Sequence, residues 1–87
     1  MAALDDDSPI VPDGLTIRRR RRRQGWSRRT FVARLRAHSE AVTGLPETIP
    51  RSLLQGVEDE NERIPYGTLC LIASGLDCNP VEILLDP

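Results

Sequence analysis

Six consecutive arginines, Arg18 to Arg23, form the segment of this sequence best suited to chemistry, and Arg28 and Arg29 follow shortly after it. A guanidinium group is permanently charged and carries planar, paired N–H donors, so it binds phosphates, guanine edges and carboxylates. The run therefore predicts an anionic partner. Its neighbours must decide whether it is a disordered basic arm or part of a folded helix.

The charge of the 87-residue chain is strongly uneven, although its net value is only −1. Residues 1–17 carry four Asp and no base, residues 18–36 carry ten Arg and no acid, and residues 37–87 carry two Arg and nine acids. This distribution favours an anionic partner at one place on the surface. The length allows one small domain with a thin core, which a partner subunit would stabilise.

The residue inventory argues against catalysis and metal binding. No nucleophile has a matched base, there is no glycine-rich phosphate loop, and His38 is the only histidine. Together with Cys70 and Cys78 it lacks the spacing of a zinc site, so we expect no enzyme, metal or cofactor, and small buried thiols. No segment has the length of a membrane span and no signal peptide precedes the charges, so we expect no membrane association and a cytoplasmic protein.

Apolar periodicity predicts an all-α domain over residues 14–87. The expected helices cover residues 14–24, 27–44, 48–57, 66–75 and 80–85. Their expected N-caps are Asp13, Ser27, Thr48 and Asn79, and Gly25 should end the first helix. No segment alternates with a period of two residues, so we expect no sheet.

The core should form from apolar residues on the inner helix faces, with His38 packing half-buried beside it. The expected core residues are Ile17, Trp26, Phe31, Leu35, Leu54, Leu69, Ile72, Leu76 and Ile83, and Val42 continues the apolar spacing of the second helix. Residues 1–13 contain three consecutive acids and two prolines, which predict a disordered acidic tail. This tail either only solubilises the protein or competes with DNA for the arginines.

Four segments carry a more specific pattern: "IRRRRRRQGWS", "SRRTFVARL", "LLQGVE" and "PYGTLCLIASGLDCNPVEIL". The matching positions are Ile17, Arg21, Gly25, Ser27, Phe31, Val32, Glu58, Pro65, Leu69, Ala73, Leu76 and Ile83. Over roughly residues 14–85 the chain resembles the phage-repressor type of helix-turn-helix domain, the Xre/Cro-like family. The resemblance implies a compact five-helix lambda-repressor-like domain.

The chain departs from the family pattern in two places. Arg36 stands where the family has a glycine-containing turn, and extra residues, 36–47, separate the two motif helices. The acidic stretch "EDENE" follows a recognition helix that is usually succeeded by a basic or neutral loop. We therefore expect an extended second helix or an insertion at residues 36–47, and an acidic loop that points away from DNA, toward Arg63 or a partner subunit.

The resemblance also divides the arginine run. Ile17 and Arg21 share a helix face, so at least one arginine points inward, and a buried guanidinium requires a carboxylate. In the family, the arginine aligned with Arg21 pairs with the glutamate aligned with Glu58, which implies a structural ion pair here. Arg20 is a second candidate for a structural role, through its stem; the other arginines of the run should face solvent.

The resemblance places the start of the recognition helix in the major groove of double-stranded DNA. It implies base readout by Arg51, Ser52 and Gln55, with Arg51 suited to guanine and Gln55 to adenine. The expected phosphate contacts are Arg18, Arg19, Arg22, Arg23, Arg28 and Arg29. Each of these residues is also compatible with an ordinary solvated or packing role.

The sequence thus predicts a sequence-specific transcriptional regulator, a repressor, that binds DNA as a homodimer. The alternative is a protein-interaction module on the same fold, an antitoxin-like or partner-binding adaptor, and RNA binding is a third, weaker option. The behaviour of residues 36–47 separates the first two, because an insertion that lifts the recognition helix off the surface would oppose DNA binding.

Overall fold

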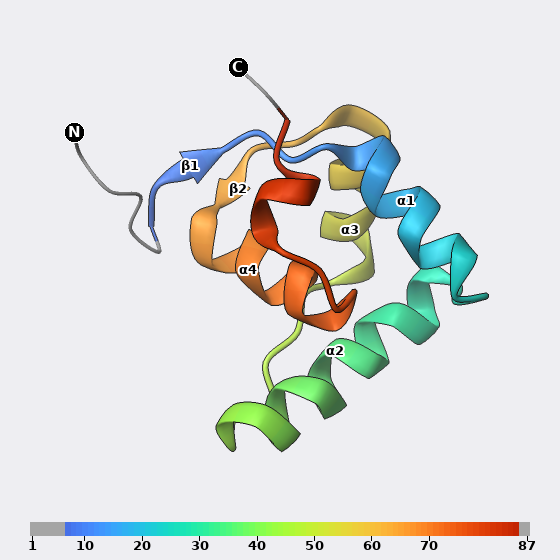
Figure 1. Ribbon diagram of the computed structural model, residues 1–87, viewed down its shortest axis with the longest axis vertical. Helices are drawn as coiled ribbons and strands as arrows, with labels where there is room; N and C mark the ends of the chain where they lie inside the picture. The colour runs from blue at the N-terminus through green and yellow to red at the C-terminus, as the bar shows by residue number, and fades with distance from the viewer. Residues whose placement is uncertain (1–6, 86–87) are drawn as a thin grey trace.

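The computed structural model describes residues 7–85 and is mostly helical (Figure 1). Its elements in chain order are β1 (Pro9–Ile10), α1 (Gly14–Arg23), α2 (Arg28–Thr43), α3 (Arg51–Glu60), β2 (Ile64–Pro65), α4 (Tyr66–Gly75) and the 3-10 turn η1 (Pro80–Ile83). A helical domain was expected and is found. The expected count of five helices is wrong, because the last element within the described residues is a single 3-10 turn rather than an α-helix.

Local signals set the ends of α1 and α2 as the sequence predicts. The carboxylate of Asp13 accepts hydrogen bonds from the backbone N–H of Thr16 (3.2 Å) and from its hydroxyl (2.8 Å). The hydroxyl of Ser27 accepts the N–H of Thr30 at 3.1 Å. Gly25 lies in the turn after α1 with a φ of 78°, a conformation that favours glycine because it has no Cβ. The turn between α1 and α2 is therefore specified locally.

The start and end of α3 differ from expectation. Pro50 is its N-cap and makes no side-chain cap, whereas the hydroxyl of Thr48 donates to the carbonyl of Val32 at 2.6 Å. Thr48 is thus a bridge to α2 and not the expected cap. The helix continues to Glu60 and ends at Asn61, which has a left-handed φ of 50°. The first three acids of the expected loop consequently belong to α3.

A small two-stranded sheet corrects the expectation of no sheet. β1 pairs antiparallel with β2, with Ile10 opposite Ile64, and Pro12 bridges to Leu84. Both isoleucines are buried. Strands of two residues are too short to produce a periodic pattern in the sequence.

This strand pairing and two further backbone hydrogen bonds hold the segment before α1 against the rest of the fold. The N–H of Asp13 donates to the carbonyl of Ile83 at 2.8 Å, and the N–H of Tyr66 donates to the carbonyl of Ser8 at 2.8 Å. Residues 8–13 are therefore built into the domain and are not part of a mobile tail. The expectation for residues 1–6 lies outside the described residues.

The hydrophobic core lies where α2 packs against α4 and α1 against α3. All the expected core residues are buried except Trp26, which is half-buried and stacks on Phe31 at a centroid distance of 5.9 Å. The core also contains five residues outside the expected set: Ile10, Ile49, Val57, Ile64 and Ala73.

The C-terminal turns of α2 project beyond the body of the domain (Figure 1). We call residues 40–47 the α2 tip. Val42 and Leu45 are 66% and 59% exposed there, so the apolar spacing of α2 does not predict burial at its end. The hydroxyl of Ser39 donates to the carbonyl of Leu45 at 2.7 Å, which folds the following loop back along the helix. The expected extension of the second helix is thus present.

Candidate nucleic-acid interface

Arg21 and Glu58 form a buried ion pair between α1 and α3. Arg21 Nε donates to Glu58 Oε2 at 2.7 Å and Nη2 donates to Oε1 at 2.8 Å, in a bidentate arrangement. Arg21 Nη1 donates to the carbonyl of Trp26 at 2.7 Å. Both residues of the pair are 5% exposed. The pair implied by the family resemblance is therefore present, and its guanidinium also fixes the turn that leads into α2.

The pKa of Glu58 is shifted below its ordinary value by this environment. Burial alone would raise the pKa, because it disfavours the charged form. Hydrogen bonds from Arg21 and Arg28 and the positive charges of both side chains outweigh burial and lower it. Glu58 is therefore an ionised carboxylate at the centre of the α1–α3 contact.

Two further arginines converge on this carboxylate and on its neighbour Asp59. Arg28 Nε donates to Glu58 Oε1 at 3.0 Å, and Arg28 Nη2 donates to Asp59 Oδ1 at 3.1 Å. Arg18 Nε lies 3.5 Å from Glu58 Oε1, and Arg18 Nη2 forms an ion pair with Asp59. We call Arg18, Arg21, Arg28, Glu58 and Asp59 the arginine–carboxylate cluster.

The cluster corrects two expectations. Arg18 and Arg28 were expected to be free for phosphates, but they are half-buried and paired, because α3 extends far enough to bring Asp59 beside them. Asp59 was expected to point toward Arg63 or a partner subunit, but it faces α1 and the start of α2. Any phosphate at Arg18 or Arg28 must therefore share these groups with a carboxylate.

Arg20 faces the opposite side of α1. Its Nη2 donates to Glu82 Oε1 at 2.9 Å, and the other oxygen of Glu82 accepts the N–H of Asn79 at 2.8 Å. Asn79 caps η1 as the sequence predicts. Arg20 thus ties α1 to the last turn, which agrees with a structural role.

The remaining arginines of the run are exposed. Arg19, Arg22 and Arg23 make no ion pair within residues 7–85. Arg22 follows Arg18 by four residues, so it lies on the same side as α3, one turn further on. Arg19 and Arg23 lie farther round the helix. Of these three, Arg22 is therefore the best placed beside α3.

An open depression of about 390 Å³ lies at the start of α3 and is lined by Arg28, Arg51, Ser52 and Gln55. We call it the α3 depression. The last three residues are exposed, and Arg51 makes no ion pair with any described residue. The structure thus brings together the three expected base-reading residues and one expected phosphate contact. Its lining offers several N–H and O–H donors from side chains that face solvent.

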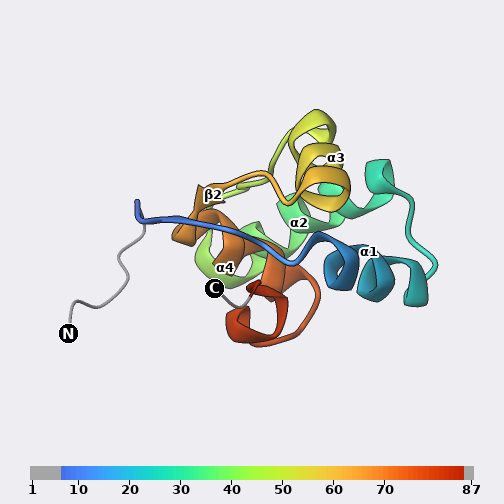
Figure 2. The same cartoon turned by 90° about the horizontal axis from the view of Figure 1, so that it is seen from above.

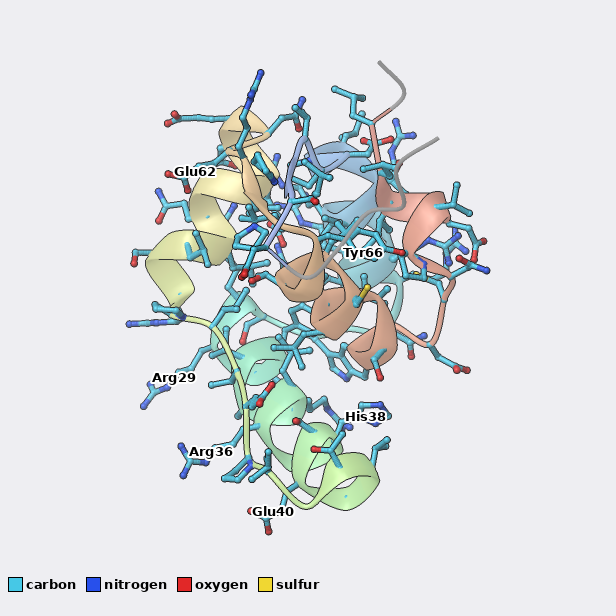
Figure 3. All side chains as sticks on the ribbon, turned by 90° about the vertical axis from the view of Figure 1, so that its left-hand side faces the viewer. Arg29, Arg36, His38, Glu40, Glu62 and Tyr66 are labelled. Carbon is cyan, nitrogen blue, oxygen red and sulfur yellow. The ribbon has the colours of Figure 1, made fainter. Side chains whose placement is uncertain are left out.

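Two arginines of α2 project on the same side of the molecule as α3. Figure 3 shows Arg29 and Arg36 pointing outward beneath the first turn of α3, whereas His38 lies on the other side of α2. Both arginines are exposed and are not ion-paired with a described residue. Sequence reasoning missed Arg36. The available signal was its spacing of seven residues from Arg29, which places both side chains on one helix face.

Arg34 was also missed. Its guanidinium carbon lies 4.7 Å from the centroid of the Trp26 ring, in a cation–π contact that covers the half-buried indole. Arg34 therefore helps to hold α2 against the turn after α1, where Trp26 lies.

The other candidate ligands are separate from this surface. His38 Nε2 lies 2.7 Å from the hydroxyl of Ser74 on α4. Cys70 and Cys78 are half-buried free thiols rather than fully buried ones, and burial raises the pKa of Cys78. Within residues 7–85 there is no group of three or more metal-ligating side chains. None of the helices described is long and apolar enough to cross a membrane.

Comparison of the chain with family models, with curated proteins and with solved structures gives no significant match.

Proposed function

We propose that this protein is a sequence-specific DNA-binding transcriptional regulator, acting as a repressor, whose α3 enters the major groove. The α3 depression carries this proposal, because Arg51, Ser52 and Gln55 present adjacent exposed donors at the first turns of one helix. Arginine pairs with the acceptors of guanine, and glutamine pairs with the donor and acceptor of adenine. The proposal agrees with the resemblance to phage-repressor-type domains.

The arginines around the α3 depression support contacts with the DNA backbone. Arg29 and Arg36 project from α2 beneath the first turn of α3 (Figure 3), and the exposed Arg22 lies on α1 one turn after Arg18. Phosphate contacts of this kind orient the helix in the groove, whereas base contacts supply the sequence preference. Arg19 and Arg23 lie farther round α1 than Arg22. In this arrangement they contact phosphates only if the bound DNA extends past α1.

We extend the proposal to a homodimer in the cytoplasm. A domain of this size makes few DNA contacts, and a second copy on a two-fold related half-site doubles them. Sedimentation of the protein alone and with a palindromic site tests this part.

The test is a titration at near-physiological salt with two fluorescent duplexes of equal length. One carries the DNA upstream of the protein's own gene and the other a random sequence. A specific regulator should bind its site roughly 10³-fold or more tightly than random duplex. Selection from a randomised duplex library provides the site if the upstream DNA lacks it. Equal, weak binding to every duplex would contradict the proposal.

The α2 tip supports a second candidate, a protein-interaction adaptor of the antitoxin-like or partner-binding kind. Val42 and Leu45 are exposed on a projecting segment, where the described residues leave most of their apolar surface uncovered. If the protein is such an adaptor, it should form a complex with a partner protein. Replacing both Val42 and Leu45 by Asp should abolish that complex. The matched control is Glu40→Gln on the same tip, which leaves both apolar side chains in place.

A further inference from the structure

We infer that Asp59 is a built-in competitor that occupies Arg18 and Arg28 in place of DNA phosphates and weakens sequence-independent binding. This inference rests on the proposed function, because it concerns the same surface. It assigns a role to a residue that neither reads bases nor belongs to the core.

The two carboxylates of the arginine–carboxylate cluster hold different ends of the same guanidinium groups. Glu58, whose side chain is 0% exposed, accepts hydrogen bonds from the Nε–H groups of Arg21, Arg28 and Arg18. Asp59, whose side chain is 37% exposed, contacts the outer Nη2 atoms of Arg18 and Arg28. The inner ends of these arginines are therefore fixed, whereas their outer ends meet a carboxylate that faces solvent.

This outer contact is the replaceable one. Ion pairs that reach solvent contribute less to stability than fully buried ones, because water screens their charges. A phosphate oxygen accepts the same Nη2 donors as a carboxylate oxygen does. Three guanidinium groups face only two carboxylates, so the cluster retains one net positive charge that attracts an anion.

The position of Asp59 places this exchange beside the α3 depression. Asp59 follows Gln55 by four residues on α3, and Arg28 both contacts Asp59 and lines the depression. DNA that docks on α3 therefore competes with Asp59 for the Nη2 donors of Arg18 and Arg28. Asp59 lowers the affinity for every duplex, and random duplex has no base contacts to offset the loss.

The first test compares Asp59→Asn with Glu60→Gln. Both variants remove one negative charge from the last turn of α3, but the described contacts of Glu60 include no arginine. With random duplex, Asp59→Asn should bind about three- to tenfold more tightly than wild type, and Glu60→Gln should change less than about twofold. The slope of log affinity against log salt should steepen by about 0.9 for each additional phosphate that the arginines neutralise in Asp59→Asn.

A second probe is independent of DNA binding. Inorganic phosphate is titrated while the Nε–H signals of Arg18 and Arg28 are followed by NMR. These signals should saturate at lower phosphate in Asp59→Asn than in wild type or Glu60→Gln. Asp59→Ser should reproduce the result, which guards against an effect peculiar to asparagine.

The outcomes separate the two proposals. If Asp59→Asn and Glu60→Gln respond equally to both probes, Asp59 contributes only general charge and the inference is wrong. If wild type binds its upstream or selected DNA no better than random duplex, the proposed function is wrong, whatever the phosphate titration gives. In that case, if Asp59→Asn binds inorganic phosphate more tightly and Glu60→Gln does not, Asp59 still competes with an anion for Arg18 and Arg28. The anion would then be free phosphate rather than DNA.

Discussion

Arginines in two neighbouring regions of this molecule, which meet at Arg28, have opposite surroundings. In the arginine–carboxylate cluster, three guanidinium groups converge on Glu58 and Asp59 between α1 and α3. Around the α3 depression, Arg29, Arg36 and Arg51 are exposed, and no described carboxylate pairs with them. The residue type is the same, so the position of the acids decides which arginines hold the fold and which remain available to a partner.

The paired side depends on a close approach of α1 to α3. A Cβ on Gly14 would lie 2.1 Å from the carbonyl oxygen of Val57 and 2.7 Å from that of Glu58. The N–H of Gly14 also donates to Asn61 Oδ1 at 2.9 Å, which fixes the left-handed residue that ends α3. On the free side, α3 lies at the edge of the fold (Figure 2), and Arg29, Arg36 and Arg51 are exposed.

The largest expected effect comes from removing the central guanidinium. Arg21→Ala leaves Glu58 buried with only the partly exposed Arg18 and Arg28 beside it, so unfolding should become easier by about 3–5 kcal/mol. Thermal and denaturant unfolding measure the change. Arg22→Ala, which removes an exposed neighbour in the same run, should stay within about 0.5 kcal/mol of wild type. Equal stability of the two variants would erase the distinction between paired and free arginines.

The next effect tests the close approach itself. Gly14→Ala forces a methyl group against the backbone of α3, which should destabilise the domain by about 1–3 kcal/mol. Gly56→Ala is the matched control on α3, since the three atoms nearest to its added Cβ all belong to Glu62, whose flexible carboxylate end can rotate away. That variant should be neutral or more stable, because alanine favours helix over glycine by about 1 kcal/mol. Unfolding titrations that show a destabilised Gly56→Ala and an unaffected Gly14→Ala would contradict this geometry.

A third effect belongs to the free side. Arg51→Ala should relax discrimination at one base pair by about 1–3 kcal/mol while leaving the affinity for random duplex nearly unchanged. Arg29→Ala should weaken binding to all sequences and flatten the salt slope, because it removes a phosphate contact. Competition titrations with single base-pair variants of the site distinguish the two patterns. If the two variants behave alike, the α3 depression does not read bases.

Arg28 does not give so clean a result. From the sequence, Arg28→Ala was expected to remove a phosphate contact alone. In the structure Arg28 also binds Glu58 and Asp59, so its loss changes stability as well. Arg29, which has no described ion pair, is therefore the better probe of the DNA backbone.

The features that sequence reasoning captured have causes that lie close together in the chain. Asp13 and Ser27 cap their helices because each side chain reaches an N–H three residues away. The inward direction of Arg21 follows from its spacing to Ile17, and only the choice of Glu58 as partner required the family resemblance. Local caps and helix faces were thus predictable.

The features that it missed depend on where a chain segment goes after it leaves a helix. Thr48 is a good cap by type, but the loop returns along α2 and brings its hydroxyl to the carbonyl of Val32. From the sequence, Asp59 is predicted to lie in a loop. It lies in a helix only because α3 continues to Glu60 and ends at Asn61. The pairing of Arg18 and Arg28 follows from that one extra turn, which ends at the left-handed Asn61.

The smallest effect is a dependence of stability on acid, and it isolates the charge of Glu58 from its packing. The pKa of Glu58 is lower in the folded protein than the ordinary value of 4.5 that serves for the unfolded chain. A lowered folded pKa contributes stability that is fully present above the unfolded pKa and is lost as pH falls through the folded pKa. Glu58→Gln keeps a similar shape but cannot ionise, so it should be less stable than wild type at neutral pH. The difference in unfolding free energy should shrink once the pH drops below about 5, where the unfolded chain begins to take up the proton.

Denaturant titrations of both proteins at a series of pH values measure this convergence. A difference that stays constant down to acid would show that the amide disrupts packing alone, and that the charge at the centre of the cluster adds nothing to the stability of the fold.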